Sequence, residues 1–252
     1  MRVVDRIEQV RKELARPTSV GLVPTMGALH DGHLSLVRRS VAECDLTLVT
    51  VFVNPLQFGP AEDFTRYPRD LDADVRAAAG VGADLVFAPS VDEMYGSTEP
   101  TVRVVVDGEL GSTLEGATRP GHFDGVATVV TKLFGITGPC RAYFGEKDWQ
   151  QLQVVRRLVT DLSLPVDVVA CPTVREPDGL ALSSRNRYLS PDERRAATVL
   201  YRALITARPG WADVVATEPL VRLDYAAEAW GRRLIAAWVG STRLIDNVAA
   251  VA

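Results

Sequence analysis

Apolar runs alternate with stretches of helical periodicity along the first 170 residues of the chain. Runs rich in β-branched and aliphatic residues are typical of buried strands, and they lie at Val20–Val23, Leu46–Val53, Asp84–Ala88, Arg141–Phe144 and Val166–Ala170. Apolar positions three and four residues apart predict helices over 2–15, 33–43, 70–80, 123–136 and 148–162. This alternation predicts a parallel sheet with helices on both faces, the Rossmann-like α/β class.

The pattern changes near residue 175. The stretch Arg175–Gly179 has the composition of a turn. Further on, Ser190, Pro191 and Glu193 are the residue types that begin a helix as its N-cap, first and third residues. We predict that this helix runs to about Ala207.

The other segments are less regular. Val102–Val106 has the pattern of an extra strand or a hairpin arm. The segment from Pro209 to Arg232 has no regular pattern, and we expect no clear hairpin around Val221–Tyr225. We therefore predict two domains, a Rossmann-like domain over 1–175 and a small α+β domain over 176–252.

Composition narrows the class of protein. The 252 residues are 47% hydrophobic and 24% charged, which is ordinary for a soluble globular protein. A net charge of −4 and a pI near 5.5 argue against a nucleic-acid-binding surface. The three cysteines show no paired spacing, the first 16 residues lack the apolar core of a signal peptide, and no apolar run is long enough to span a membrane. We expect a cytoplasmic enzyme without membrane or nucleic-acid partners.

Two of the three histidines, His30 and His33, follow the first predicted strand in a glycine-containing turn. A strand, a turn and a helix start together present backbone N–H groups and a positive dipole end to a phosphate. Imidazole N–H groups at this place add donors for an oxyanion that gains charge in a transition state. Accidental clustering and zinc binding are the alternatives, but zinc needs three or four ligands and His122 is the only other histidine.

Polar side chains follow other predicted strands as well. Asn54 and Gln57 follow the second strand, where a simple β-turn is the alternative interpretation. Lys147 follows the run at 141–144 and begins a helix, where the helix dipole disfavours a cation, so a charge-binding role is favoured. Glutamines begin that helix at Gln150, Gln151 and Gln153. Because ligands of parallel sheets bind at the carboxyl ends of the strands, these residues are candidates for a site.

Two further polar clusters have competing interpretations. The loop Ser183–Asn186 carries two hydroxyls and a guanidinium, groups that bind phosphate oxygens, although such a loop is more often a solvated turn. Finding it after the last strand, with the histidine motif after the first, is typical of one nucleotidyltransferase superfamily. The aspartates Asp70, Asp72 and Asp74 are most simply the solvated N-terminus of a helix rather than metal ligands.

With these motifs in order, the chain resembles the pantoate–β-alanine ligase (pantothenate synthetase) family. The resemblance rests on motifs in family order at Pro24–His33, Phe52–Phe58, Tyr67–Arg69, Arg119–Phe123, Phe144–Leu152, Leu182–Asn186 and Thr242–Asn247. It implies a Rossmann-like domain with a small C-terminal cap domain. It also implies that ATP and pantoate form a bound pantoyl adenylate with release of pyrophosphate, after which β-alanine displaces AMP to give pantothenate. Mg²⁺ accompanies the ATP, and a homodimer is expected.

The resemblance also implies roles for single residues. His30, His33 and Lys147 would stabilise the transition state of phosphoryl transfer. The residues implied in ATP binding are Pro24, Met26, His30, His33, Gly145, Lys147, Asp148, Val174, Ser183, Ser184 and Arg185. Those implied in substrate binding are Met26, Asn54, Gln57, Arg119, His122 and Gln151, with Gln57 and Gln151 as the pantoate pair. No protein side chain is expected to ligate a metal.

Three rival functions differ in what they require of the sequence. A cofactor adenylyltransferase of the same superfamily would need basic residues where Asn54, Gln57 and Gln151 stand. A tRNA ligase would need an RNA-binding domain and a basic surface. A binding protein that had lost catalysis would be expected to have lost a charged site residue, and the motifs retain theirs.

Overall fold

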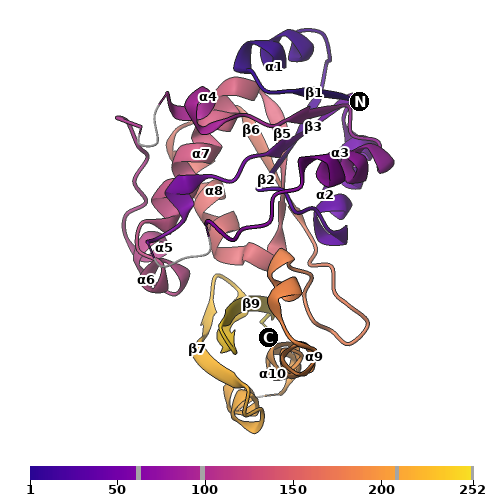
Figure 1. Ribbon diagram of the computed structural model, residues 1–252. Coiled ribbons are helices and arrows are strands. Elements are labelled where there is room, and N and C mark those ends of the chain that lie inside the picture. The colour runs from indigo at the N-terminus through magenta and orange to yellow at the C-terminus, as the bar shows by residue number, and fades with distance from the viewer. Residues whose placement is uncertain (61–63, 97–99, 208–209, 251–252) are drawn as a thin grey trace. The chain divides into compact units, whose positions relative to one another are not determined.

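The computed structural model describes residues 1–60, 64–96, 100–207 and 210–250, and the chain divides into two compact units (Figure 1). The first unit comprises Met1–Glu146 and Gln150–Cys171, and the second comprises Lys147–Trp149 and Pro172–Ala252. The longer segment of the second unit thus starts at Pro172, whereas the sequence pattern put the domain boundary at residue 176. In the ranges described, no helix has both the length and the apolar character that crossing a membrane requires.

The first unit is built on a parallel sheet to which six strands of the described residues contribute, in the order β1-β4-β3-β2-β5-β6. Their bounds are β1 Arg2–Val4, β2 Val20–Thr25, β3 Leu46–Val51, β4 Leu85–Phe87, β5 Cys140–Gly145 and β6 Val166–Cys171. Neighbouring strands align Val23 with Val49, and Val49 with Val86. The predicted parallel sheet is confirmed.

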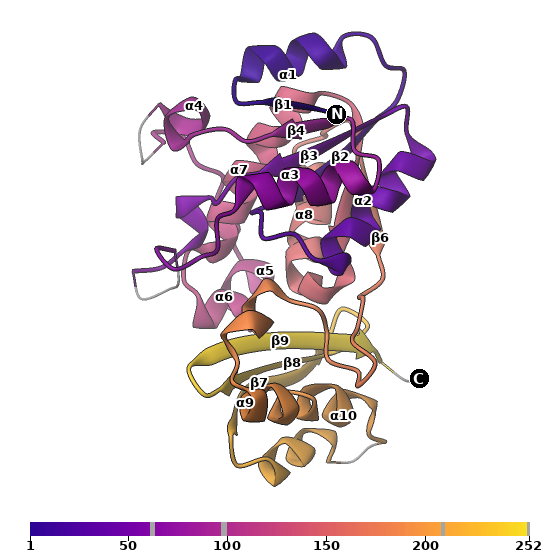
Figure 2. The same ribbon diagram turned by 45° about the vertical axis from the view of Figure 1, so that its right-hand side comes forward.

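Helices cover both faces of this sheet, as predicted. Their bounds are α1 Ile7–Leu14, α2 Asp31–Glu43, α3 Leu71–Gly80, α4 Val91–Tyr95, α5 Glu109–Ser112, α6 Glu115–Thr118, α7 His122–Thr137 and α8 Trp149–Asp161, with 3₁₀ turns η1 Pro55–Gln57 and η2 Glu146–Asp148. Figures 1 and 2 show α2 and α3 on one face and α7 and α8 on the other. Leu36 and Val37 of α2 and Ala78 of α3 pack against Val23 and Val49 of the sheet. Because strand residues alternate between faces, covering both explains why the strands are apolar throughout.

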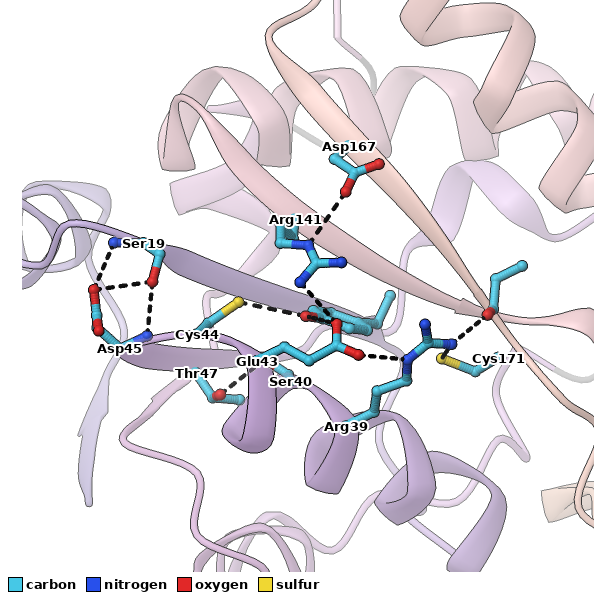
Figure 3. A network of polar contacts seen from close by, with 12 residues as sticks. Ser19, Arg39, Ser40, Glu43, Cys44, Asp45, Thr47, Arg141, Asp167 and Cys171 are labelled. Atoms are coloured by element: carbon cyan, nitrogen blue, oxygen red, sulfur yellow. Dashed lines mark hydrogen bonds and ion pairs between the residues drawn. The ribbon is translucent and has the colours of Figure 1, made fainter.

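An ion-pair network ties α2 to β5 and β6 (Figure 3). Glu43 accepts a hydrogen bond from Arg39 Nε at 2.9 Å and lies 2.8 Å from Arg141 Nη1, while Arg39 also donates to the carbonyl of Ala170 at 2.7 Å. The bond from Arg39, followed by one from the Tyr143 hydroxyl, lowers the pKa of the Glu43 carboxyl. The network fixes the C-terminal end of the helix that begins at the histidine motif.

Two predictions in the first unit are wrong. The stretch 2–15 is not one helix, because Arg2–Val4 forms β1 and α1 starts at Ile7. β1 pairs with the distant β4, a contact that local periodicity does not reveal. Val102–Val106 is neither a strand nor a hairpin arm. Its backbone N–H groups are bonded by side chains of α7 instead, at 3.0 Å for Val104 with Thr128 and 2.8 Å for Val106 with Asp124.

The second unit is a small α+β fold, as expected. Its elements are η3 Ser184–Tyr188, α9 Pro191–Ala196, α10 Val199–Ile205, η4 Trp211–Thr217, β7 Val221–Ala229, β8 Arg232–Val239 and β9 Thr242–Ala249. The three strands found among its described residues form an antiparallel sheet in the order β7-β8-β9. Leu200 and Leu204 of α10 pack with Ile235 and Val239 of β8 in the core of this unit.

The helix start at Ser190 is confirmed, since Ser190 and Glu193 form a reciprocal capping box. The helix does not continue to Ala207, because α9 ends at Ala196 and α10 begins at Val199. At the break the Thr198 hydroxyl donates to the Arg195 carbonyl at 2.8 Å, a local bond that competes with helical pairing.

The prediction that no hairpin forms around Val221–Tyr225 is also wrong, because β7 and β8 pair along their length. The register shifts between Leu223 and Tyr225, leaving Asp224 as an extra residue in β7. Such a bulge breaks the alternation of inward and outward residues, which is the signal that sequence reasoning uses. Pro209 lies outside the described residues.

Candidate active site

The histidine motif forms the start of α2. His30 is the N-cap residue, and its Nδ1 accepts a hydrogen bond from the Gly32 N–H at 3.1 Å. The His33 ring lies in the first turn, with its centroid 4.1 Å from that of His30. Because Nδ1 of His30 accepts, the proton of the neutral ring lies on Nε2, which is then a donor. The motif therefore joins a ring N–H donor to the positive end of a helix dipole.

The turn that leads to His30 is held by Asp74 of α3. Its carboxylate accepts from the backbone N–H of Ala28 at 3.0 Å and of Leu29 at 2.7 Å. Gly27 and Ala28 both have positive φ, at +80° and +52°. A Cβ on Gly27 would lie 2.6 Å from Asp74 Oδ2, so this close approach needs glycine. Asp74 thus fixes the backbone immediately before His30.

The interpretation of all three aspartates as a solvated helix start needs correction for Asp74. Asp70 is exposed and caps α3 through the Ala73 N–H, as expected. Asp74 is only 4% exposed, since the backbone of the Gly27–Leu29 turn supplies its hydrogen bonds. Sequence reasoning missed it because an acidic residue in the first turn of a helix has the same pattern whether buried or solvated.

A second cluster brings together four predicted residues of the first unit: Asn54, Gln57, Arg119 and His122. Asn54 is fully buried, and its Nδ2 donates to Gln57 Oε1 and to the Gly125 carbonyl, both at 3.0 Å. Its Oδ1 accepts from the Leu56 N–H at 3.3 Å and from the Tyr95 hydroxyl at 2.9 Å. Both amide protons and both lone-pair directions of Asn54 are thus used within the protein. Since its Oε1 accepts from Asn54, Gln57 presents Nε2 as its donor.

Arg119 and His122 are bound to the same backbone carbonyl of Gln57. The distances to this oxygen are 3.3 Å from Arg119 Nη2 and 2.9 Å from His122 Nδ1. A carbonyl can only accept, so Nδ1 of His122 carries a proton. His122 Nε2 then accepts from Arg119 Nη1 at 3.0 Å. Close packing of α7 on η1 requires Gly125, where a Cβ would lie 2.1 Å from the Leu56 carbonyl oxygen.

The other predicted residues of the first unit lie at strand ends or helix starts. Pro24 is near the end of β2, Met26 follows that strand, and Gly145 is the last residue of β5. Gln151 is in the first turn of α8 and is half-buried. The neighbouring Gln150 is buried, and it binds the N–H of Glu115 and the carbonyls of Leu110 and Thr113, which is a structural role.

The second unit carries the remaining candidates. Lys147 and Asp148 lie in η2, with Lys147 Nζ 3.5 Å from Asp148 Oδ1, and the lysine side chain is 20% exposed. The Val174 carbonyl accepts from the Leu182 N–H at 3.0 Å, closing a small loop. Ser183 follows this loop and caps η3, since its hydroxyl accepts from the Arg185 N–H at 3.3 Å.

An ion pair that the sequence did not predict supports this part of the chain. Arg175 forms two hydrogen bonds with Asp246, at 2.6 and 2.9 Å, and donates to the Gly179 carbonyl at 3.0 Å. Burial raises the pKa of Asp246, and the Arg175 guanidinium opposes that rise. Arg175 had been assigned to a simple turn, and no local pattern marks its ion pair with a residue of β9.

Comparisons with known proteins agree with these motifs. The sequence profile of a family described as pantoate-beta-alanine ligase matches residues 2–249. A pantothenate synthetase of Rubrobacter xylanophilus is 55% identical over 91% of this chain and 90% of its own length. One of a Roseiflexus species is 52% identical over 98% of each chain.

Solved structures give the same result. The crystal structure of a pantothenate synthetase from Thermus thermophilus covers 99% of both chains at 49% identity, with a TM-score of 0.94. A pantoate-beta-alanine ligase from Francisella tularensis, in complex with beta-gamma ATP and β-alanine, has a TM-score of 0.90 at 35% identity over 99% of this chain and 97% of its own. The family profile matches almost the whole sequence, and relatives matched over nine tenths or more of their length are 52–55% identical, so this chain belongs to the pantoate–β-alanine ligase family.

Proposed function

We propose that this chain condenses pantoate with β-alanine in two ATP-dependent steps. In the first step a carboxylate oxygen of pantoate attacks the α-phosphorus of ATP, and the bond to pyrophosphate breaks to leave pantoyl adenylate. In the second step the amine of β-alanine attacks the acyl carbon, AMP leaves, and the nitrogen gives up a proton as the amide of pantothenate forms. The observation that carries this proposal is the paired His30 and His33 at the start of α2 in a chain of this family.

The first step needs charge stabilisation more than proton transfer. A carboxylate is already ionised at neutral pH, so no base is required to activate it. Charge grows on the phosphate oxygens as the pentacoordinate state forms, and fixed donors stabilise it. His30 donates through Nε2, the nitrogen that its bond to the Gly32 N–H leaves protonated. His33 and the ammonium of Lys147 stabilise the same developing charge.

ATP binding uses several groups, each in a role suited to its chemistry. The hydroxyls of Ser183 and Ser184 and the guanidinium of Arg185 bind phosphate oxygens. The other residues of the proposed nucleotide site are Pro24, Met26, Gly145, Asp148 and Val174.

Pantoate is bound by the amides of Gln57 and Gln151, with Met26 in apolar contact. Because Asn54 uses all of its hydrogen-bonding positions inside the protein, it acts on the substrate by holding the Gln57 amide in one orientation. Arg119, anchored on the Gln57 carbonyl, lies beside this group, and its guanidinium suits the carboxylate of β-alanine. His122 serves the same end by holding the Arg119 guanidinium through Nε2.

Mg²⁺ enters with ATP in this proposal, bound by phosphate oxygens. The side chains assigned to the phosphates, such as Lys147, Arg185 and Ser184, are cations and hydroxyls that fit phosphate oxygens, whereas Mg²⁺ prefers anionic oxygen ligands. In the part of the chain that the structure describes, no group of three or more His, Cys, Asp or Glu side chains is placed to hold a metal ion. When bound, the ion neutralises phosphate charge and helps pyrophosphate to leave.

Two proposals follow from the family resemblance alone. The protein forms a homodimer, and it acts in the cytoplasm. Light scattering coupled to gel filtration checks the first, and a mass of one chain would contradict it.

Pyrophosphate exchange tests the proposed reaction. With ATP, Mg²⁺ and pantoate, and without β-alanine, the protein should exchange labelled pyrophosphate into ATP. Adding β-alanine should then release AMP and pantothenate in equal amounts. A second sample with phosphopantetheine in place of pantoate tests the adenylyltransferase alternative. Exchange that requires β-alanine, or that runs with the other acceptor and not with pantoate, would refute the assignment.

A further inference from the structure

Two adjacent residues of β9, Asp246 and Asn247, are buried and form polar contacts, and the proposed mechanism gives neither residue a role. Their exposed fractions are 3% and 2%. A polar side chain buried to this degree is retained only where its hydrogen bonds are made, so its partners indicate its role. Those partners lie in the segment Lys147–Trp149, in the loop that ends before Ser183, and at Arg232 of β8.

Asn247 binds the backbone of Lys147. Its Nδ2 donates to the Lys147 carbonyl at 2.9 Å, and its Oδ1 accepts from Arg232 Nη1 at 3.0 Å. With one bond at each end, the amide has a single orientation. The NH₂ group therefore faces the Lys147 carbonyl.

The same segment is held a second time through Trp149. The Arg232 guanidinium lies 4.1 Å from the centre of the Trp149 ring, a cation–π contact. The indole N–H of Trp149 donates to the Trp230 carbonyl at 3.1 Å. Asn247 and Arg232 thus form one connected group that fixes Lys147–Trp149 at a backbone carbonyl and at a side chain.

Asp246 and Arg175 hold Asn247 in place. Asp246 Oδ1 accepts from the Asn247 N–H at 2.7 Å, and Arg175 Nη2 donates to the Asn247 carbonyl at 3.1 Å. Arg175 also pairs with Ala181 in an isolated bridge, within the loop that leads to Ser183. Asp246 and Arg175 thus bind Asn247 at both its backbone N–H and its carbonyl.

We propose that Asn247 is a positioning residue for adenylate formation, which it serves by fixing the backbone of Lys147. The inference rests on the proposed function, in which the Lys147 ammonium stabilises the transition state. Lysine has a long, flexible side chain, so the place of its backbone decides where the ammonium can reach. A misplacement of about 1 Å costs about 100-fold in rate, because charge stabilisation depends on geometry. Asn247 itself touches no reacting atom in this proposal.

The test compares Asn247→Ala in two backgrounds by pyrophosphate exchange with pantoate. In the otherwise unchanged protein we expect kcat to fall about 10- to 100-fold, with KM for ATP and pantoate within about threefold. In the Lys147→Ala background the same change should lower kcat by less than about twofold, because the side chain that Asn247 positions is gone. An equal fall in both backgrounds, or no fall in the first, overturns the inference.

Two further variants separate positioning from folding. Val248→Ala shortens a neighbouring side chain of β9 that packs on the core of the second unit, and it should lower the melting temperature but keep kcat. Asn247→Asp keeps the shape and the acceptor for Arg232 while removing the donor to Lys147, so it should reproduce the loss if Asn247→Ala does not fold. A loss of kcat in Val248→Ala equal to that in Asn247→Ala would overturn the inference.

The outcomes also separate this inference from the proposed function. If Lys147→Ala exchanges at the full rate, the role of Lys147 fails and the inference fails with it. If Lys147→Ala is slow and both Asn247 variants are fast, only the inference fails.

Discussion

Asparagine in place of Asp74 would remove one of the two acceptor oxygens that hold the turn before His30. In the native turn, Asp74 Oδ2 accepts from Ala28 and Oδ1 from Leu29, at 3.0 and 2.7 Å. An asparagine side chain keeps one oxygen and turns an NH₂ group toward the other backbone N–H. Asp74→Asn therefore replaces one attraction with a donor facing a donor, at constant shape.

The magnitude follows from these two bonds. A hydrogen bond to a charged group contributes about 1.5–3 kcal/mol, so Asp74→Asn should cost at least about 2 kcal/mol of stability. The turn also holds Ala28 at φ +52°, a conformation that costs a non-glycine residue on the order of 1–3 kcal/mol. With its support weakened, the turn should relax to a more common conformation and displace His30. We expect pyrophosphate exchange to fall about 10- to 100-fold, since a shift of about 1 Å in a catalytic group has an effect of that order.

Two measurements and one control test this reasoning. Thermal denaturation reports the loss of stability, and pyrophosphate exchange at a temperature well below the transition reports the loss of rate. Asp70→Asn is the control. Asp70 accepts a hydrogen bond from the Ala73 N–H of its own helix at 2.9 Å and does not hold the turn before His30 through that bond. The control should cost at most about 1 kcal/mol and keep full activity. Full exchange by Asp74→Asn despite reduced stability would refute the positioning role, as would an equal loss of rate in the control.

Three further predictions concern single groups. Replacing His30 or His33 with alanine should slow pyrophosphate exchange about 10²- to 10³-fold at nearly unchanged melting temperature, and exchange at the full rate would remove that histidine from the mechanism. Burial raises the pKa of the Cys140 thiol to about 12, so iodoacetamide at pH 8 should leave Cys140 unmodified in the folded protein, and rapid labelling seen by mass spectrometry would contradict its burial. The bond from Arg39 holds the pKa of Glu43 below its ordinary value, so this stabilisation is complete above about pH 4.3 and is lost as pH falls further. Glu43→Gln should therefore melt lower at pH 7 and show a weaker decline of melting temperature toward acid pH, whereas parallel declines would show that the pair does not contribute.

Elements with a local signal were predictable from the sequence. The central strands are apolar because both faces of the sheet are covered, and this continuous pattern marked β2, β3, β5 and β6. β1 has only three residues, and it pairs with β4, which lies far along the sequence. Its formation therefore depends on a long-range contact that local periodicity does not reveal. The sequence did not predict β7 for another reason. The bulge at Asp224 interrupts the alternation of inward and outward residues that would have indicated a strand.

The candidate site divides along a similar line. Residues proposed to touch a ligand, such as His30, Gln57 and Ser183, stand in polar motifs that follow apolar strands in the sequence, and this change of pattern marks them. Asp74 stands inside the regular element α3, where a polar residue is interpreted as facing solvent. Asn247 belongs to the motif Thr242–Asn247, but its position inside β9 gave no sign of its hydrogen bonds.

Whether such a polar residue is buried or faces solvent depends on tertiary packing. A single sequence does not reveal that packing. Asp72 and Asp74 lie two residues apart on one helix, yet the first is exposed and the second is 4% exposed. Both carboxylates interact favourably with the positive end of the helix dipole, so the local sequence does not distinguish the buried one from the exposed one. The difference comes from the turn with positive φ at Gly27 and Ala28, because the backbone N–H groups of Ala28 and Leu29 there need an acceptor. A turn held at positive φ beside a proposed phosphate site thus requires a hydrogen-bond acceptor from elsewhere in the chain, and Asp74 is as necessary to the position of His30 as the turn itself.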